Sequence, residues 1–234
     1  MLVVALLGVT VLSAQNWKPA STEWYYPVPP SVNPGKTIGQ PPSDAIVLFD
    51  GKDLSQWVSI KGGEAKWEIN KNKEMVIVPG SGDITTKGYF GDCQLHIEFK
   101  CPAPDKEHGN SGIFLQSTYE IQVWDGGTPL YVNGQVGSMY KQSAPLAMAY
   151  TKHSEWQVYD IFWVAPKFGP GEVLEEPARI TVTLNGIVVQ NNYIIKGTTP
   201  YIGLPEYKAH GRLPLLLQDH GSAVAYRNIW IRNL

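Results

Sequence analysis

The segment Val182-Thr183-Leu184-Asn185-Gly186-Ile187-Val188-Val189 decides the fold of this chain. Two runs rich in β-branched residues flank Asn185-Gly186, a pair that favours a two-residue hairpin turn in which both residues adopt positive φ. The segment therefore predicts two antiparallel strands, over residues 178–184 and 187–193, joined by a tight turn.

The same pattern of short apolar runs and turn residues extends outward from this hairpin, from residue 45 to the end. No long stretch keeps a 3.6-residue apolar period, so helices should be few and short. Short strands at this spacing are typical of an antiparallel sandwich or barrel, and the lack of a fixed internal period argues against a propeller. Besides the hairpin, we expect strands at residues 46–49, 66–70, 74–78, 93–100, 112–117, 119–124, 136–141, 156–164, 213–219 and 223–232.

The composition narrows the class of protein. The chain has 234 residues, 43% of them hydrophobic, which suffices for one large domain with a sizeable core. Its formal net charge is only -2, so neither nucleic acid nor an anionic membrane surface is an expected partner. The 23 Gly and 18 Pro residues fit short strands joined by turns.

Three segments are expected along the chain. Residues 1–14 contain an apolar run that ends in small residues at Ala14 and resembles a secretory signal, although no Lys or Arg precedes it. The run is too short to span a bilayer, so we expect a periplasmic or secreted protein without a transmembrane span in its mature form. A buried N-terminal strand is a weaker alternative. Residues 15–44 form a Pro-rich arm, either extended over the domain or a spacer, and residues 45–234 form the domain.

The two cysteines, Cys93 and Cys101, bracket one expected strand. At about 3.3 Å per residue their Cα atoms would lie roughly 26 Å apart, whereas a disulfide requires less than about 7 Å. Both cysteines are therefore expected to be free thiols.

The segment Tyr119-Glu120-Ile121-Gln122-Val123-Trp124-Asp125 is the leading candidate for a functional site. Because successive side chains of a strand alternate between its faces, Glu120 and Gln122 share a polar face opposite two apolar residues. Trp124 follows, and Asp125 stands where the strand ends. Two carboxyl groups and a carboxamide beside an indole are typical of a sugar-processing cleft. The alternative is the solvated face of an edge strand.

Further polar side chains could meet these on one sheet face. Glu98 shares a face with His96 and Lys100, and Arg227 either enters the core beside a carboxylate or marks a bulge in the last strand. Taken singly, each of these residues is more often structural. The remaining candidates are Gln218 and His220 after an apolar run, and Asn110 and Ser111 in a small polar loop.

Missing motifs exclude several classes of enzyme. The chain contains no G-x-S-x-G nucleophile elbow, phosphate-binding loop, dinucleotide fingerprint or H-E-x-x-H motif. Its five histidines are scattered, so no metal site follows from spacing. A divalent metal ion held by two or three His, Glu or Asp side chains stays an open alternative.

Seven motifs follow one another along residues 45–234: Leu48-Phe49-Asp50-Gly51-Lys52-Asp53-Leu54-Ser55-Gln56-Trp57, Glu98-Phe99-Lys100, Asn110-Ser111-Gly112-Ile113-Phe114, the segment from Tyr119 to Asp125, Gly137-Ser138-Met139-Tyr140, Leu217-Gln218-Asp219-His220-Gly221 and Tyr226-Arg227-Asn228-Ile229. In that order they resemble the 3-keto-disaccharide hydrolase family, also described as 3-keto-glucoside lyases or hydratases. The combined order is far more specific than any single motif.

The resemblance implies an all-β, concanavalin A-like jelly-roll sandwich of two antiparallel sheets, with a carbohydrate cleft on the concave sheet. It also implies an exported protein. The pattern Glu120-x-Gln122-x-x-Asp125 looks like a variant of the Glu-x-Asp-x-x-Glu strand of jelly-roll β-glucanases, with one carboxylate replaced by an amide and another shortened. Retaining hydrolysis needs two carboxyl groups about 5–5.5 Å apart, so the resemblance favours a different route.

In that route, a ketone at C3 of the sugar acidifies the C2 proton. A general base removes this proton, the C1 substituent leaves, and water adds to the resulting glycal. Such a site needs a base, a donor for the enolate oxygen and an acid for the leaving group. We expect Glu120 to be the base or the acid, and Gln122 to be an orienting donor. A partner oxidoreductase would supply the ketone.

The other roles in this route have several candidates. His220 or Arg227 would stabilise the oxyanion, and Glu98 or Asp125 would carry the second proton. The expected substrate contacts are Trp124 and Tyr140 as an apolar platform for the sugar ring, with Asn110, Ser111 and Gln218.

Two other classes of function stay open. A non-catalytic carbohydrate-binding module would bind intact glycans without releasing product, because this fold serves lectins equally well. A structural or assembly protein that contacts a partner through its aromatic N-terminal arm would show no sugar affinity, and it would lose its complex when residues 15–44 are removed.

Overall fold

The computed structural model describes residues 17–21, 23, 27–102, 108–125 and 131–234. The chain divides into two compact units, Met1–Ser31 and Val32–Leu234. The described residues of the first unit contain one 3-10 helix, η1 (Pro19–Ser21). The predicted signal-like segment at residues 1–14 lies outside the described residues.

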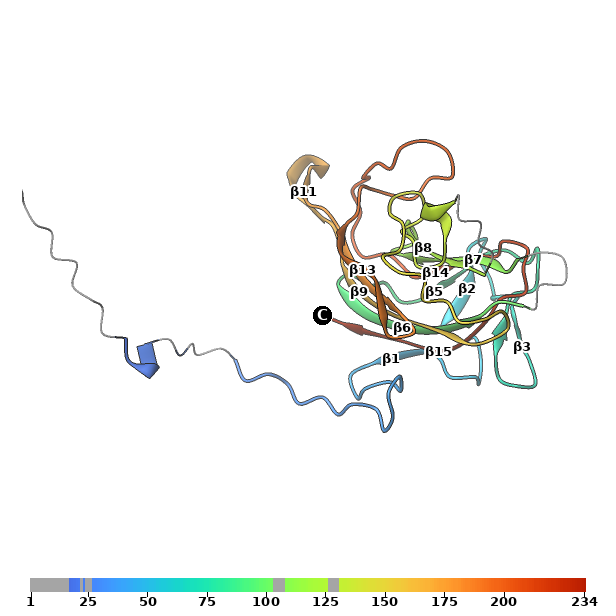
Figure 1. Ribbon diagram of the computed structural model, residues 1–234, viewed down its shortest axis with the longest axis horizontal. Coiled ribbons are helices and arrows are strands. Elements are labelled where there is room, and N and C mark those ends of the chain that lie inside the picture. Colours follow the sequence, from blue (N-terminus) through green and yellow to red (C-terminus); the bar gives the residue numbers. More distant parts are fainter. Residues whose placement is uncertain (1–16, 22, 24–26, 103–107, 126–130) are drawn as a thin grey trace, which may run out of the picture. The chain divides into compact units, whose positions relative to one another are not determined.

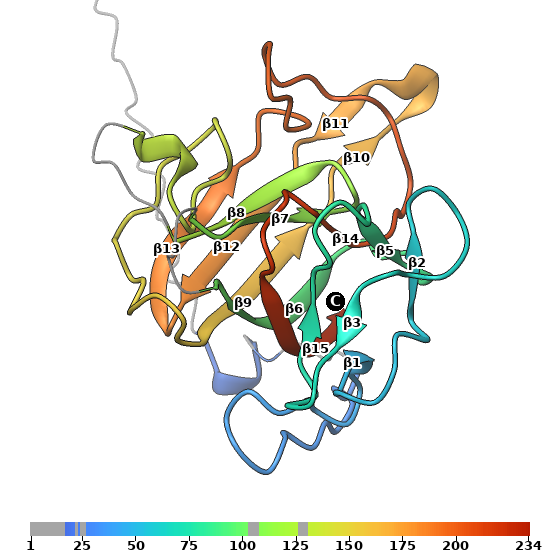
Figure 2. The same cartoon turned by 90° about the vertical axis from the view of Figure 1, so that its right-hand side faces the viewer.

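The second unit is a sandwich of two antiparallel sheets, which confirms the predicted fold class (Figures 1 and 2). The larger sheet has the strand order β13-β12-β9-β6-β15-β4-β3, with β1 paired to β15, and the smaller sheet has the order β2-β5-β14-β7-β8. Strands β10 and β11 form a separate two-stranded sheet. The strands are β1 (Ile46–Phe49), β2 (Trp57–Ser59), β3 (Glu68–Ile69), β4 (Met75–Val76), β5 (Ile84–Thr86), β6 (Cys93–Lys100), β7 (Asn110–Leu115), β8 (Tyr119–Trp124), β9 (Gln157–Val164), β10 (Lys167–Phe168), β11 (Leu174–Glu176), β12 (Arg179–Leu184), β13 (Ile187–Ile194), β14 (Leu216–Leu217) and β15 (Ala225–Asn233).

Helices are few and short, as expected. Besides η1, the described residues contain two 3-10 helices, η2 (Val132–Gly134) and η3 (Pro170–Glu172), and no α-helix. None of the helices in this part of the chain has the length and apolar character needed to cross a membrane.

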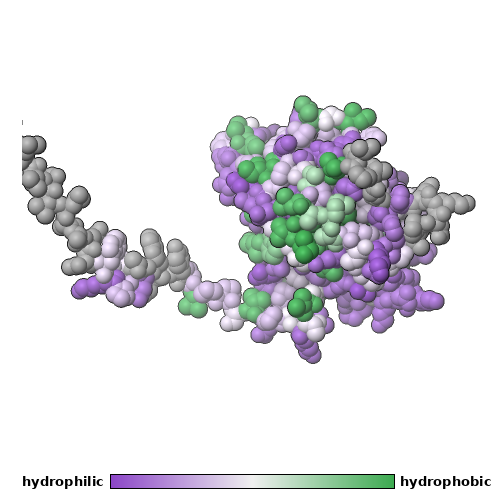
Figure 3. Space-filling view, in the orientation of Figure 1, coloured by the Kyte–Doolittle hydropathy of each residue, from purple (hydrophilic) through white to green (hydrophobic). Residues whose placement is uncertain are grey.

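The core lies between the two sheets, where alternate side chains of each strand meet. The ring of Tyr119 on the smaller sheet lies 5.1 Å from the ring of Trp163 on the larger one. The hydroxyl of Tyr159 on β9 donates a 2.7 Å hydrogen bond across the core to the carbonyl of Gln122 on β8. On the face drawn in Figure 3, hydrophilic residues surround several apolar patches. The contacts of Tyr119 and Gln122 with the larger sheet thus hold β8 against the core.

Several local predictions are confirmed. Asn185 and Gly186 adopt φ values of 53° and 80° and join β12 to β13. Cys93 and Cys101 are free and buried. The pairing of β15 with β6 shifts register between Arg227 and Trp230, so Arg227 belongs to a bulge and is exposed rather than entering the core.

Other strand predictions are wrong. Residues 136–141 form no strand, although Met139 makes isolated bridges to Ile121 and Ser143. Of residues 213–219, the structure forms a strand only at Leu216–Leu217. The short strands β2, β5, β10 and β11 were not expected, because two or three residues are too few to show an alternating pattern.

Residues 32–44 of the predicted arm lie against β15. The carbonyl of Gly39 accepts hydrogen bonds of 2.9 Å from Asn228 Nδ2 and from Trp230 Nε1. Arg232 pairs with Asp44 at 2.7 Å. This part of the arm is thus held on the outer face of the larger sheet.

Candidate active site

Strand β8 divides its side chains between the core and a polar face. Tyr119, Ile121 and Val123 are fully buried in the core. Glu120 and Gln122 project to the opposite side of the smaller sheet, as the alternation predicts, yet they are only 6% and 4% exposed. The polar face of this strand is therefore covered by protein rather than by solvent.

An irregular segment lies along the edge of β8 and provides part of this cover. Gln122 N donates to the carbonyl of Ser138 at 3.1 Å, and Gly137 N donates back to the carbonyl of Gln122 at 3.3 Å. Tyr140 N donates to the carbonyl of Glu120 at 3.1 Å. Gly137 and Lys141 have φ values of 82° and 59°, and these left-handed residues turn the segment away from regular strand geometry.

A cavity of about 290 Å³ opens above this face of β8. Strands β7 and β8, the segment after β14 and two loops near residues 140 and 200 supply its walls. Its lining residues are Asn110, Phe114, Glu120, Gln122, Tyr140, Thr199, Tyr201, Gln218 and His220. Six of these are predicted site residues, which the fold brings together from segments that are up to 110 residues apart.

Larger hollows exist elsewhere on the domain, two of them beneath residues 32–43 and one beside β2, with volumes of about 740, 800 and 570 Å³. None of the three is lined by a buried carboxyl group. Size alone therefore does not identify the site, and the chemistry of the lining favours the smaller cavity at β8.

Glu120 is the titratable group at the centre of this cavity. Burial raises the pKa of its carboxyl group to about 8. No basic side chain among the residues that line the cavity forms an ion pair with it. A carboxyl group with a pKa in this range can either donate or accept a proton near neutral pH.

Gln122 and Tyr140 flank Glu120 with hydrogen-bonding groups. Gln122 Nε2 donates to the carbonyl of Gly134 at 3.3 Å, while its Oε1 is buried and has no partner in the described residues. The hydroxyl of Tyr131 donates to the hydroxyl oxygen of Tyr140 at 2.9 Å. Burial raises the pKa of Tyr140, so its hydroxyl stays protonated, and its own hydrogen is free to be donated to another acceptor.

His220 and Asn110 lie on the other side of the cavity. Asn110 Nδ2 lies 3.3 Å from His220 Nδ1. If the amide nitrogen donates this bond, the hydrogen-bond network places the imidazole hydrogen on Nε2. His220 is exposed, so its ring borders both the cavity and the surrounding water.

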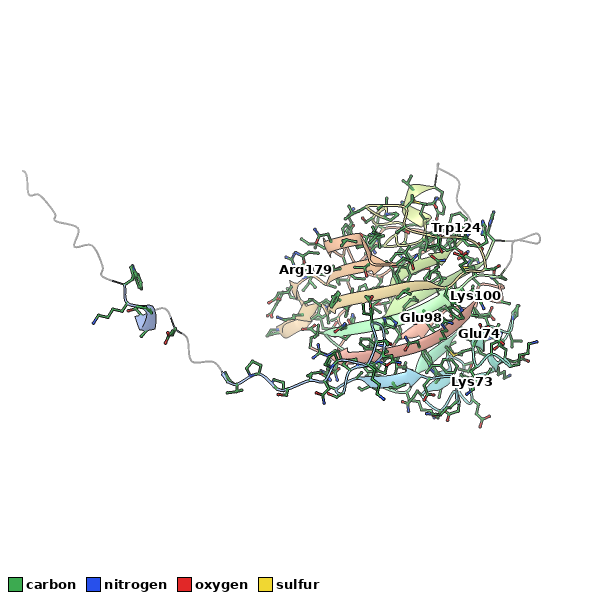
Figure 4. The ribbon with its side chains drawn as sticks, turned by 60° about the horizontal axis from the view of Figure 1, so that its bottom comes forward. Lys73, Glu74, Glu98, Lys100, Trp124 and Arg179 are labelled. Carbon is green, nitrogen blue, oxygen red and sulfur yellow. The ribbon has the colours of Figure 1, made fainter. Side chains whose placement is uncertain are left out.

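Two predicted residues, Glu98 and Arg227, lie on the larger sheet and do not contribute to the cavity. Glu98 alternates along β6 with core residues and so faces away from the smaller sheet. It accepts hydrogen bonds from Arg227 Nε at 2.6 Å and from Asn228 at 2.8 Å. Burial alone would raise the pKa of Glu98, but hydrogen bonds from His96, Asn228 and Arg227 lower this pKa to about 2. Figure 4 shows Glu98 and Lys100 on this sheet and Trp124 on the other.

The other predicted residues surround the cavity without lining it. Ser111 faces the core, where its hydroxyl donates to the carbonyl of Gln218 at 2.6 Å and accepts from Tyr226 at 2.7 Å. It is 0% exposed and cannot contact a substrate. Asp125 is buried beside His153, with 3.0 Å between Oδ2 and Nδ1. Trp124 is half-buried, and its ring meets the edge of Tyr131 at 6.2 Å.

Sequence reasoning missed three lining residues, Phe114, Thr199 and Tyr201. Phe114 could have been found, because it shares a strand face with Asn110 and stands opposite Glu120 in the register of β7 and β8. Thr199 accepts a 3.1 Å hydrogen bond from Glu120 N through its hydroxyl. Thr199 and Tyr201 lie in a long loop after β13, and no local pattern there indicates which strand the loop approaches.

A family model described as the 3-keto-alpha-glucoside-1,2-lyase-like domain matches residues 44–232. The chain is similar to the crystal structure of a "putative glycosyl hydrolase" from Parabacteroides distasonis ATCC 8503, with 48% identity and a TM-score of 0.87 over 93% of this chain and 97% of that one. A second protein of that organism with the same description is 21% identical, with a TM-score of 0.62 over 82% of this chain and 94% of that one, and it supports the fold alone. No curated protein matches the chain.

Proposed function

This chain belongs to the 3-keto-alpha-glucoside-1,2-lyase-like family, and we propose that it cleaves the glycosidic bond of 3-keto-glycosides by elimination followed by hydration. Its family and its 48%-identical relative support a carbohydrate-active enzyme in general. Elimination, rather than ordinary hydrolysis, is supported by one observation: Glu120 has the only carboxyl group among the residues that line the cavity. Ordinary glycoside hydrolysis uses two carboxyl groups that flank the scissile bond, whereas elimination beside a ketone can use one.

The steps follow from the acidity of the C2 proton beside the C3 ketone. The Glu120 carboxylate accepts this proton, and the electron pair of the C2–H bond forms an enolate whose charge rests on the C3 oxygen. The enolate then forms the C1–C2 double bond and expels the C1 oxygen, which takes up a proton from an acid in the site. Water adds at C1 and C2 is reprotonated, so the net reaction is hydrolysis of the glycosidic bond.

The residues beside Glu120 suit the two remaining roles. Tyr140 can donate to the enolate oxygen, because Tyr131 donates to its oxygen and leaves its hydrogen free. His220 can donate a hydrogen bond from Nε2 to the leaving oxygen, because Asn110 occupies Nδ1, and the proton that Glu120 took from C2 can then pass to this oxygen. Tyr140 thus takes the oxyanion role expected of His220 or Arg227, and His220 acts at the leaving oxygen in place of Glu98 or Asp125. Arg227, Glu98 and Asp125 do not line the cavity.

The volume of the cavity also limits the size of the substrate that can enter it. Its volume of about 290 Å³ lies at the small end of ligand pockets, about 300–1,000 Å³, and suits one sugar ring rather than a long chain. The unpartnered Oε1 of Gln122 can accept a hydrogen bond from a sugar hydroxyl. Trp124 at the rim offers an apolar surface to the part of the substrate that leaves.

The proposal requires a source of the ketone. Ordinary glycosides carry a hydroxyl group at C3, so an oxidoreductase must oxidise C3 before this enzyme acts. The signal-like residues 2–14 support an exported enzyme, and we therefore place the reaction outside the cytoplasm.

The direct test compares a 3-keto-glucoside with its non-oxidised parent and follows product release by the full chain. We expect release from the keto sugar alone, and an enzyme with Glu120→Gln should lose it while Glu98→Gln keeps it. Release from the parent glycoside would establish conventional hydrolysis instead. Saturable binding of either sugar without product would establish a carbohydrate-binding module.

A further inference from the structure

The segment after β14 carries two residues of the cavity, Gln218 and His220, on either side of Asp219. Gln218 and His220 line the cavity, whereas Asp219 does not. Its carboxylate instead accepts two hydrogen bonds from backbone amides. Gly82 N donates to Oδ2 at 2.9 Å, and Gly221 N donates to Oδ1 at 3.0 Å. Asp219 therefore ties the segment that carries His220 to the loop before β5.

A second carboxylate makes the same connection in the opposite direction. Asp219 N donates to Oδ1 of Asp83 at 2.8 Å. The backbone pairing of β14 with β5 ends at Leu217 and Ile84, so bonds from the two carboxylates continue the contact where the regular pairing stops. We call Asp83 and Asp219 the carboxylate clamp.

The loop before β5 is itself anchored to the core. The carbonyl of Gly82 accepts a 3.0 Å hydrogen bond from Nε1 of Trp67, and the carbonyl of Asp83 accepts one of the same length from Ile60 N. Trp67 is buried, and its ring stacks on that of Tyr226 with 5.8 Å between the centroids. The clamp thus links the position of His220 to residues that are fixed by the core.

The imidazole of His220 has little else to hold it. His220 is exposed, and in the part of the chain that the structure describes, Asn110 is the only side chain that is hydrogen-bonded to it, at 3.3 Å. The next residue, Gly221, has a φ of 81°, a left-handed conformation that glycine adopts readily. An exposed ring with one long hydrogen bond keeps its orientation only if its backbone is held in place.

We propose that Asp83 and Asp219 position His220 for its action at the leaving oxygen, an inference that rests on the proposed function. Neither carboxylate touches the substrate, and both act through the backbone of the segment. With the clamp intact, the ring stays against Asn110 and presents the hydrogen on Nε2 to the leaving oxygen. Without the clamp, the ring adopts several orientations and the leaving oxygen loses its donor.

Two 3-keto-glucosides that differ only in their leaving group, methanol or 4-nitrophenol, test this role. The 4-nitrophenolate ion is stable and needs little help to depart, whereas methoxide needs a donor. We expect Asp219→Ala to lower kcat about 10–100-fold on the methyl glycoside and about threefold or less on the nitrophenyl glycoside. Asp219→Asn keeps one acceptor oxygen and should recover part of the loss. In an enzyme that already carries His220→Ala, Asp219→Ala should cause no further loss.

Nitrogen-15 spectra of the histidine side chains test the clamp without using activity. At a pH where the imidazole is neutral, we expect one tautomer of His220, with its hydrogen on Nε2, in the unaltered protein. Asp219→Ala should give a mixture of both tautomers. Asp92→Asn is the matched control, because Asp92 Oδ1 accepts a 2.7 Å hydrogen bond from Ala165 N but does not line the cavity. This control should change neither kcat nor the spectrum of His220.

Thermal midpoints show which variants are folded, and Asp219→Asn serves for both comparisons if the alanine variant does not fold. The proposal is overturned if the loss is equal on both glycosides and His220 keeps a single tautomer. It is equally overturned if the losses from Asp219→Ala and His220→Ala add in the double variant. If the unaltered protein releases product from neither glycoside, the proposed function fails, and the spectra still decide whether the clamp holds His220.

Discussion

Gly112 on β7 lies directly beneath the Glu120 carboxyl group, so close that a Cβ atom at position 112 would stand 2.6 Å from Glu120 Oε1. The same atom would stand 2.6 Å from the Phe114 ring. Only a glycine leaves the space that the proposed base occupies. The absence of a side chain on one strand therefore sets the position of the functional group on the next.

Gly112→Ala should damage activity more than stability. The added methyl group must displace the Glu120 carboxyl group, and we expect kcat to fall by at least about 10-fold, since small misplacements in an active site are costly. Overpacking should lower the free energy of unfolding by about 1–3 kcal/mol. The measurements are kcat on a 3-keto-glucoside and urea unfolding. Gly211→Ala is the matched control, because a Cβ there meets no atom within 4 Å.

Glu120→Gln should lower the rate by about 100-fold or more, and the unaltered enzyme should show a matching pH profile. A base works only when it is deprotonated, and burial raises the pKa of Glu120 to about 8. The value of kcat/KM should therefore rise with pH and level off above about 8. A fall across this range would mean that Glu120 acts as the acid.

Glu120 should also make folding depend on pH. In the unfolded chain its pKa is the ordinary 4.5, whereas in the folded protein it is about 8. Between these values the folded state binds the proton and the unfolded state does not, so the free energy of unfolding falls as pH rises. At about 1.4 kcal/mol for each pKa unit, the upper limit of this loss is about 5 kcal/mol.

Glu120→Gln isolates this contribution, because the amide does not ionise. We expect the variant and the unaltered protein to unfold alike at pH 4, and the variant to be the more stable one at pH 9. Urea unfolding at a series of pH values measures the difference. Equal stabilities at pH 9 would mean that the folded protein does not raise this pKa.

Tyr140→Phe should reduce kcat and leave KM nearly unchanged, because the enolate that its hydroxyl stabilises forms only during the reaction. Loss of one oxyanion donor lowers kcat by about 10²–10³. Tyr131→Phe should cause a smaller loss in the same direction, since it removes only the bond that orients Tyr140. A larger effect of Tyr131→Phe than of Tyr140→Phe would mean that Tyr131 is the donor to the enolate and Tyr140 only orients it.

Arg227→Ala should leave kcat/KM within about twofold, because Arg227 lies on the larger sheet and its nearest carboxylate is Glu98. Its side chain is 45% exposed, so we expect a loss of about 1 kcal/mol or less in the free energy of unfolding. Steady-state kinetics and urea unfolding check both values. A large loss of activity would show that Arg227 takes part in the reaction.

Local patterns predicted the features that depend on neighbouring residues. The alternation of β8 correctly separated Glu120 and Gln122 from the core, and Asn185-Gly186 correctly located a hairpin. Ser111 shows the limit of this reasoning. It was expected in a loop, but β7 begins at Asn110, and adjacent strand residues point to opposite faces. Asn110 therefore lines the cavity while Ser111 is in the core.

Pairing between distant segments could not be predicted in this way. The strand of Glu98 and the strand of Glu120 show similar polar faces in the sequence. No local pattern indicates that the first belongs to the larger sheet and the second to the smaller one. Tyr201 reaches the cavity through a loop whose course depends on tertiary contacts. The scattered histidines have no spacing that predicts a metal site. That His108 and His153 both lie beside Asp125 follows only from the tertiary structure.

The segment at residues 136–140 has a further consequence for β8, which is the last strand of its sheet. An exposed edge strand with free N–H and C=O groups is a template on which another chain can add, and this is a common start of aggregation. Here the outward backbone groups of Glu120 and Gln122 are taken by Gly137, Ser138, Tyr140 and Thr199. The strand that carries the proposed base therefore offers no free backbone groups at Glu120 and Gln122 to an added strand, and the segment that shapes the cavity also protects this edge of the sheet.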